Sequence, residues 1–243
     1  MWWERLSDEE LLDVPLSRLG LRIEASPLGP RLARLHVELD RAGLRFRPHV
    51  WLSTSWFSPD GVPGFAIPFF LAHPRLVRLE RRFMGEAEGS SAAWCLRLLR
   101  HETGHALDTA HRLHRRRAWR ERFGPAGAPY RSSYAPKPHS RRFVRNLDHG
   151  YAQSHPIEDF AETFAVWLDS RGWRRAYRGW PALAKLEYVD ALVREIAGRP
   201  VAVVSRERPG SLRETRLTLR QHYRRKQARQ ARLHATRRRE LLR

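Results

Sequence analysis

The sequence predicts an α+β fold in which a small mixed N-terminal sheet is followed by a helical C-terminal half and by a basic helical tail. Residues 21–54 read as strand, helix and strand, because alternating and apolar segments flank a stretch with a helical apolar period. Residues 74–197 carry longer apolar runs with helical spacing and helix-capping residues. After Pro200 the composition becomes strongly basic. We therefore expect one domain over residues 1–200 and a helical or partly disordered tail over residues 201–243.

Local signals define the N-terminal elements. A capping-box pattern predicts a short helix after Ser7. Residues 21–24 alternate apolar and polar side chains as a half-buried strand does. Residues 31–41 place apolar side chains at helical spacing, and Gly43 ends that pattern. A second strand is expected over residues 49–54.

Residues 64–71 are a further strand candidate, and two prolines restrict its place in a sheet. Pro63 and Pro68 lack the backbone N–H that a central strand donates, so an edge position is favoured. The segment either presents an open sheet edge or lines the core. The next helix is expected to start at a cap formed by His73 and to run to Arg82.

The sequence His-Glu-Thr-Gly-His at residues 101–105 has the spacing of a metal-binding helix. Positions i and i+4 lie one turn apart on the same helix face, so His101 and His105 can bind one ion. Zinc takes nitrogen ligands about 2.0–2.1 Å away in a tetrahedral arrangement. Glu102 then points to the side where a zinc-bound water would lie.

The surroundings of this motif favour a helix over two unrelated surface histidines. Residues 92–99 lead into it without glycine or proline, and Ser90 and Ser91 provide an N-cap. Gly104 lies inside the motif although glycine weakens a helix by about 1 kcal/mol relative to alanine. Close approach of another backbone at Gly104 would explain its presence.

A third protein ligand is expected, because a catalytic zinc usually has three ligands and a water. Pro156 suits the first position of a helix, on which Glu158 and Glu162 lie one turn apart. Aromatic residues on the same helix make burial of an unpaired glutamate costly, so a cation is expected nearby. We predict Glu158 as the ligand and Glu162 as the carboxylate that holds a ligand histidine through its other ring nitrogen. The alternative is that both acids lie on a solvated face.

Two further features accompany the motif helix. Asp108 falls within about 20° of His101 around the helix, so it is expected to orient a ligand histidine or a nearby arginine. His114 is expected to be exposed to solvent. Residues 123–142 are rich in glycine, proline, serine and tyrosine, and such long loops are often functional or disordered.

Four sequence blocks carry a resemblance to a known family: PGFAIPFFLAHPRL, LRHETGHALD, YAQSHPIEDFAETFAVWL and WPALAKLEYVD. Across residues 16–197 the chain resembles a bacterial family of zinc-binding metallopeptidases. The pair HETGHALD and YAQSHPIEDFAE looks like the gluzincin arrangement, and the spacing of Tyr151, Glu158 and Glu162 is similar to that of anthrax lethal factor-like peptidases. The resemblance implies a zincin-like fold, a Zn²⁺ cofactor, Glu158 as zinc ligand, and Tyr151 as a residue that assists catalysis.

The resemblance departs from the family at one point, and it says little about substrate. Many members carry an N-terminal zinc ribbon, which a chain with one cysteine cannot form. The activity and natural substrate of the family are poorly defined.

The leading functional hypothesis is a zinc-dependent hydrolase that cleaves peptide bonds in a peptide or protein substrate, with Glu102 as general base. Residues 64–71 would pair with an extended substrate. The alternative is a nucleic-acid- or protein-binding module with a structural or vestigial zinc site.

Composition bounds the location of the chain. Cys95 is the only cysteine, which excludes an internal disulfide and is compatible with a reducing compartment. The N-terminus has no apolar run typical of a secretory signal, and no window is apolar enough to span a membrane. A cytoplasmic location is expected.

The C-terminal segment is strongly basic. Residues 206–243 carry 14 arginines or lysines and 3 glutamates, so a polyanion such as nucleic acid is a candidate partner. The alternative is a codon bias, because the whole chain has 43 arginines but only 3 lysines. The segment is expected to lack the apolar residues needed to dock, and its removal is expected to leave the zinc site folded.

Overall fold

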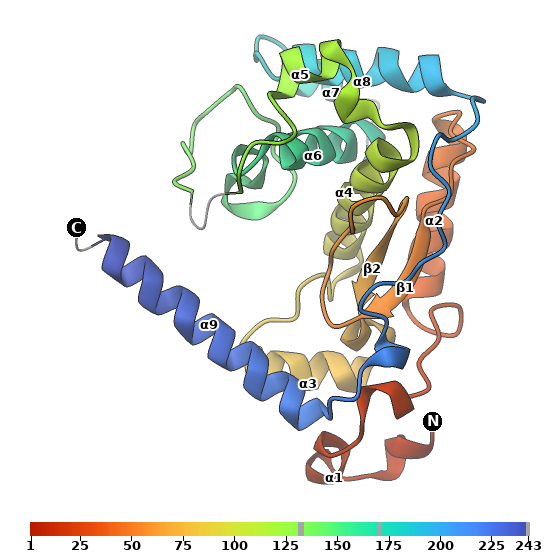
Figure 1. Cartoon of the computed structure of the whole chain (residues 1–243), viewed down its shortest axis with the longest axis vertical. Coiled ribbons are helices and arrows are strands. Elements are labelled where there is room, and N and C mark those ends of the chain that lie inside the picture. The colour runs from red at the N-terminus through yellow and green to blue at the C-terminus, as the bar shows by residue number, and fades with distance from the viewer. Residues whose placement is uncertain (131–133, 170–171, 242–243) are drawn as a thin grey trace.

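The computed structural model describes residues 1–130, 134–169 and 172–241, and it shows a mixed α+β fold that is mostly helical (Figure 1). The helices are α1 Asp8–Leu12, α2 Leu28–Arg41, α3 Pro74–Met84, α4 Ala92–His111, α5 Arg117–Phe123, α6 Pro156–Asp169, α7 Trp173–Ala176, α8 Leu183–Ile196 and α9 Leu219–Leu241. The strands are β1 His49–Ser53 and β2 Gly64–Pro68. Short 3₁₀ segments cover Trp2–Arg5, Leu16–Arg18, Phe69–Ala72, Leu113–Arg115, Asp148–Gln153 and Leu212–Glu214. Among the described residues, no helix combines the length and apolarity needed to cross a membrane.

The sheet is small and parallel rather than mixed. β1 and β2 pair in a register that sets His49 opposite Gly64, and β2 packs against α4 (Figure 1). β2 is buried along its whole length. Its second edge is partly covered by Phe57, whose carbonyl accepts a hydrogen bond of 2.9 Å from the Ala66 N–H. The predicted strand is confirmed over residues 64–68, whereas residues 69–72 form a 3₁₀ segment. Of the two alternatives for this segment, the burial of β2 and the cover from Phe57 favour the one in which it lines the core.

The strand predicted at residues 21–24 is wrong. The chain turns there, and the carbonyl of Ile23 accepts hydrogen bonds from the Ser26 N–H at 3.2 Å and the Ser26 hydroxyl at 2.7 Å. Leu21 and Ile23 are partly buried against the core, which accounts for the alternating pattern without any strand. The turn leads directly into α2, a helix that the sequence predicted.

The close crossing of α4 and α6 organises the helical half. A Cβ placed on Gly104 would lie 2.9 Å from the Ala161 Cα, nearer than real Cβ contacts come. The prediction of a close backbone approach at Gly104 is thus confirmed, and the partner is α6. Both helices start where expected: the Ser91 hydroxyl accepts a hydrogen bond from the Trp94 N–H at 3.2 Å, and Pro156 is the first residue of α6.

The first turns of α9 are part of the core. Leu219 and Tyr223 are buried, with 0% and 1% of their surface exposed. The Leu219 N–H donates to the Val14 carbonyl at 3.1 Å, beside an antiparallel bridge between Pro15 and Thr218. Segments from the two ends of the chain therefore meet in one packed layer.

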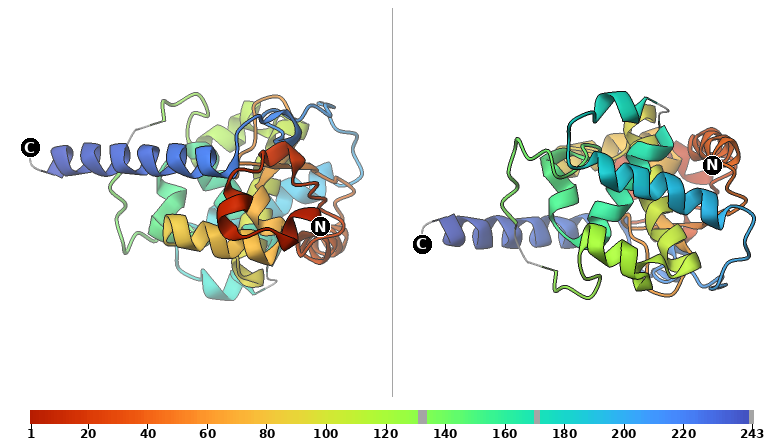
Figure 2. Two further views of the ribbon diagram at one scale, coloured as in Figure 1. Left: turned by 90° about the horizontal axis from the view of Figure 1, so that it is seen from below. Right: turned by 90° about the horizontal axis from the view of Figure 1, so that it is seen from above.

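Ion pairs hold the same part of α9. Arg220 binds Asp13 at 2.8 Å, and Lys226 pairs with the buried Glu80 of α3. Beyond these contacts the helix extends away from the body, and Leu233 is 54% exposed (Figures 1 and 2). The expectation that the basic segment lacks docking residues is wrong for its first half, and packing continues across the predicted boundary at residue 200.

We expect the two leucines of α9 to differ sharply in their contribution to stability. Leu219→Ala should lower the free energy of unfolding by about 2–5 kcal/mol, because it leaves a cavity in the core. The same substitution at the exposed Leu233 should change it by less than about 0.5 kcal/mol. Urea unfolding followed by circular dichroism measures both values. Similar small losses in the two variants would show that α9 does not contribute to the core.

Candidate metal centre

Three side chains from two helices converge where α4 and α6 cross. His101 and His105 project from successive turns of α4, and Glu158 projects from the first turn of α6. The His101 and His105 Nε2 atoms lie 3.0 Å apart, and each lies 3.2 Å from Glu158 Oε2. Ligands of a tetrahedral zinc are roughly 3.3–3.6 Å apart, so a small outward adjustment accommodates the ion. The group could hold a metal.

The electrostatics of this group favour a cation between the three side chains. Burial opposes the charged form of His101, but hydrogen bonds to Glu158 and Glu162 outweigh it and raise its pKa to about 10. Burial would likewise raise the pKa of Glu158, yet the neighbouring His105 and His101 hold it well below its usual range. A positive charge shared between two imidazole nitrogens and a carboxylate oxygen stabilises this arrangement, and either protons or a metal ion can supply it. These donor types are the ones that Zn²⁺ prefers.

Glu162 lies directly behind His101, one turn after Glu158. Its carboxylate is fully buried, and Oε1 lies 2.8 Å from His101 Nδ1. Asn146 Nδ2 donates to the same oxygen at 2.7 Å, and the Leu147 N–H donates to Oε2 at 2.8 Å. These contacts fix the orientation of the imidazole and leave its Nε2 facing the other two side chains.

Glu102 and Tyr151 flank the group on the cleft side. The Ser58 hydroxyl donates a hydrogen bond of 2.8 Å to Glu102 Oε2, and this carboxylate is 6% exposed. The Tyr151 ring lies 5.6 Å from the His101 ring, centroid to centroid. Burial, with the nearby charge of Glu158, raises the pKa of the Tyr151 hydroxyl, so it remains a proton donor at neutral pH.

Tyr130 is a neighbour of the metal group that the sequence analysis missed. Its hydroxyl donates to Glu158 Oε1 at 2.9 Å, so the two carboxylate oxygens of Glu158 have separate partners. The ring stacks on His155 at a centroid distance of 3.8 Å and an angle of 10°. The only available signal was the tyrosine-containing loop of residues 123–142, which the sequence marked as a functional or disordered loop. Residues 131–133 of that loop lie outside the described residues.

Asp108 is placed elsewhere than expected. Its Oδ2 lies 2.5 Å from Nδ1 of His114, and its Oδ1 has no hydrogen-bond partner within the described part of the chain. The carboxylate therefore meets His114 rather than a ligand histidine or an arginine. His114 is correspondingly half-buried rather than fully exposed.

The metal group opens onto a cleft made of two connected hollows of about 640 and 900 Å³. Both hollows are lined by Trp56, His101, Glu102 and Tyr151, so the group lies where they join. The first half of the cleft is also lined by Lys226 and later residues of α9. The basic helix therefore forms one wall of the approach to the metal group.

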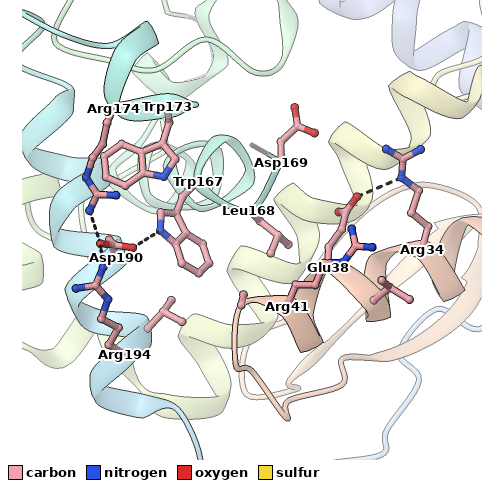
Figure 3. A pocket seen from close by; sticks show the side chains of 13 residues that line it. Arg34, Glu38, Arg41, Trp167, Leu168, Asp169, Trp173, Arg174, Asp190 and Arg194 are labelled. Atoms are coloured by element: carbon pink, nitrogen blue, oxygen red, sulfur yellow. Dashed lines mark hydrogen bonds and ion pairs between the residues drawn. The ribbon is translucent and has the colours of Figure 1, made fainter. Parts of the chain in front are cut away.

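A separate hollow of about 890 Å³ lies at the far end of α6, between α2, α7 and α8 (Figure 3). Its carboxylates are paired with neighbouring cations: Asp190 binds Arg174 and Arg194, each at 2.6 Å, and also accepts a hydrogen bond of 3.1 Å from Trp167 Nε1. Glu38 likewise binds a buried arginine, Arg100, at 2.8 Å. None of the residues of the metal group lines this hollow, so the cleft at the metal group is the candidate active site.

We expect Glu162→Gln to lower zinc affinity by roughly 10–100-fold, because the imidazole of His101 loses the carboxylate that orients it. Competition with a chromophoric chelator measures the dissociation constant. Glu187→Gln, an exposed carboxylate of α8, is the matched control and should bind zinc as the native chain does. Equal affinities in the two variants would contradict the role assigned to Glu162.

Comparison with known proteins gives one match. Residues 94–176 match the family model described as "Putative zinc-binding metallo-peptidase". The matched segment runs from α4 to α7 and contains the metal group together with Tyr151. No curated protein and no solved structure matches the chain. Over this segment, the chain is therefore similar to zinc-binding metallopeptidases.

Proposed function

We propose that the chain is a zinc-dependent peptide hydrolase of the gluzincin type with a zincin-like fold. The observation that carries the proposal is the convergence of His101, His105 and Glu158 beside Glu102 in an open cleft. A purely structural zinc is usually enclosed by four protein ligands, whereas a catalytic zinc has three and keeps one position for water or substrate. Three ligand-type side chains next to a cleft fit the catalytic arrangement.

The metal and the side chains have separate tasks in this proposal. When bound, Zn²⁺ supplies a Lewis acid that polarises a water molecule and the peptide carbonyl. Glu102 accepts the proton of the attacking water and then delivers it to the leaving amine. The hydrogen bond from Ser58 holds the Glu102 carboxylate toward the cleft. The hydroxyl of Tyr151, kept protonated by its surroundings, donates to the oxyanion that develops on the substrate.

A binding module with a structural zinc site is the second candidate. It is favoured by the basic composition of residues 206–243, which attracts a polyanion such as nucleic acid, and by the extension of α9 from the body (Figure 2). The same helix also lines the cleft, which the hydrolase proposal accommodates and a pure binding module leaves unexplained. A polyanion partner and a cytoplasmic location stay predictions.

Glu102→Gln is the direct test of the hydrolase. We expect the variant to keep one zinc per chain and to lose roughly 10²–10⁴-fold in turnover, because it lacks the general base. Zinc content is measured by atomic absorption, and cleavage is measured by mass spectrometry of a proteome-derived peptide mixture.

The exposed Glu187→Gln serves as the control and should cleave as the native chain does. Full activity in Glu102→Gln would remove Glu102 as the base. One bound zinc with no cleavage by the native chain, over a broad peptide mixture, would favour the binding module.

Replacement by phenylalanine should have different effects at Tyr151 and at Tyr130. Tyr151→Phe should lower turnover by roughly 10²–10³-fold with little change in zinc affinity, because the lost donor acts on the developing oxyanion. Tyr130→Phe should act on the metal instead, weakening zinc binding through Glu158. Measurements of turnover at saturating zinc and of zinc affinity distinguish the two variants. A loss of zinc affinity in Tyr151→Phe and a loss of turnover at saturating zinc in Tyr130→Phe would show that the two roles are exchanged.

A further inference from the structure

The cleft has different charges on the two sides of the metal group. The hollows that meet at His101, Glu102 and Tyr151 extend toward opposite ends of α4. Figure 1 shows α3 and α9 at one end of α4, and α5 at the other. A chain that passes both hollows must cross the metal group between them. The charged side chains of one half therefore lie on one side of a substrate bond held at the metal, and those of the other half lie on its other side.

The half toward α3 carries an excess of negative charge. Glu86, Glu88 and Asp148 line it and are exposed, and within the described part of the chain none of them has a hydrogen bond or ion pair. Glu80 also lines this half. It is 1% exposed and pairs with Lys226 through one oxygen, while its second oxygen has no hydrogen-bond partner among the described residues.

Among the described residues that line this half, Arg229, His149 and Lys226 are the opposing groups. Lys226 pairs with the buried Glu80, and its charge also lowers the pKa of Glu88, which burial raises. The exposed carboxylates therefore outnumber the opposing arginine. This local excess is unusual in a chain with a net charge of +20.

The half toward α5 has the opposite sign. Arg112 and Arg115 line it, both are exposed, and neither has an ion pair within the described residues. Asp60 opposes them, whereas Asp108 is paired with His114 and contributes little free charge. Positive charge therefore prevails at the C-terminal end of α4.

We propose that the cleft selects an extended peptide with a basic side chain on one side of the bond at the metal and an acidic side chain on the other. The inference rests on the proposed peptide hydrolase and specifies its substrate class. The basic side chain lies among Glu86, Glu88 and Asp148. The acidic side chain lies beside Arg112 and Arg115. A peptide with the reverse charge order meets like charges on both sides.

The test uses binding, so that it does not depend on turnover. Three labelled peptides of identical composition carry two lysines and two glutamates around an apolar centre, with lysines first, glutamates first, or the four charges alternating. Fluorescence anisotropy measures their affinity for the zinc-loaded full-length Glu102→Gln protein. Because net charge is the same in all three, attraction that depends on net charge alone does not distinguish them.

We expect either the lysines-first or the glutamates-first peptide to bind roughly fivefold or more tightly than the other two. One exposed ion pair accounts for a factor of up to about five in affinity. Glu86→Gln/Glu88→Gln should abolish this preference, and Arg112→Gln/Arg115→Gln should reduce it, whereas Glu187→Gln should leave it unchanged. Equal affinities for the three peptides, or a preference that survives both double variants, would overturn the inference.

A cleavage arm separates this inference from the proposed function. The native zinc-loaded chain is incubated with the favoured peptide, and products are read by mass spectrometry. Ordered binding without cleavage would contradict the hydrolase and leave the charge selection standing. Cleavage of all three peptides at equal rates and with equal affinities would support the hydrolase and contradict the charge selection.

Discussion

The close contact between α4 and α6 is the constraint on which the rest of the site depends. Gly104 lies against Ala161 at a separation that excludes a side chain, so the two helix axes approach unusually closely there. This approach brings Glu158 within 3.2 Å of two histidines on the neighbouring helix and places Glu162 against His101. A glycine in mid-helix costs about 1 kcal/mol in helix propensity. The close α4–α6 crossing, which no larger residue at position 104 would allow, offsets this loss of helix propensity.

The sequence predicted the parts of the site that local signals define. Two helix starts follow from the cap at Ser91 and from the proline that begins α6. The one-turn spacings define the helix faces that carry the candidate ligands. Contacts between distant segments have no such signal. The hydroxyl of Ser58 reaches Glu102 across 44 positions, and Tyr130 reaches Glu158 from a loop without regular structure. The alternation at residues 21–24 predicts a strand that does not form, because partial burial against the core gives the same pattern.

The C-terminal helix shows why composition is a poor guide to packing. Its average character is polar and basic, yet four side chains at helical spacing form a stripe that meets the core: Leu219, His222, Tyr223 and Lys226. His222 is 6% exposed, and burial, with the charge of Lys226, lowers its pKa to about 4, so it packs as a neutral ring. A few residues with the right period therefore suffice to dock a helix whose remaining surface is charged.

The meeting of the two terminal segments has a consequence for the order of folding. Val14 and Pro15 pair with residues 218–219, and Tyr223 completes the layer between α3 and α9. At a synthesis rate of about 5–20 residues per second, α4 leaves the ribosome on the order of ten seconds before Tyr223 is made. During that interval the apolar surface that α9 later covers is open to solvent. The nascent chain is then most exposed to aggregation.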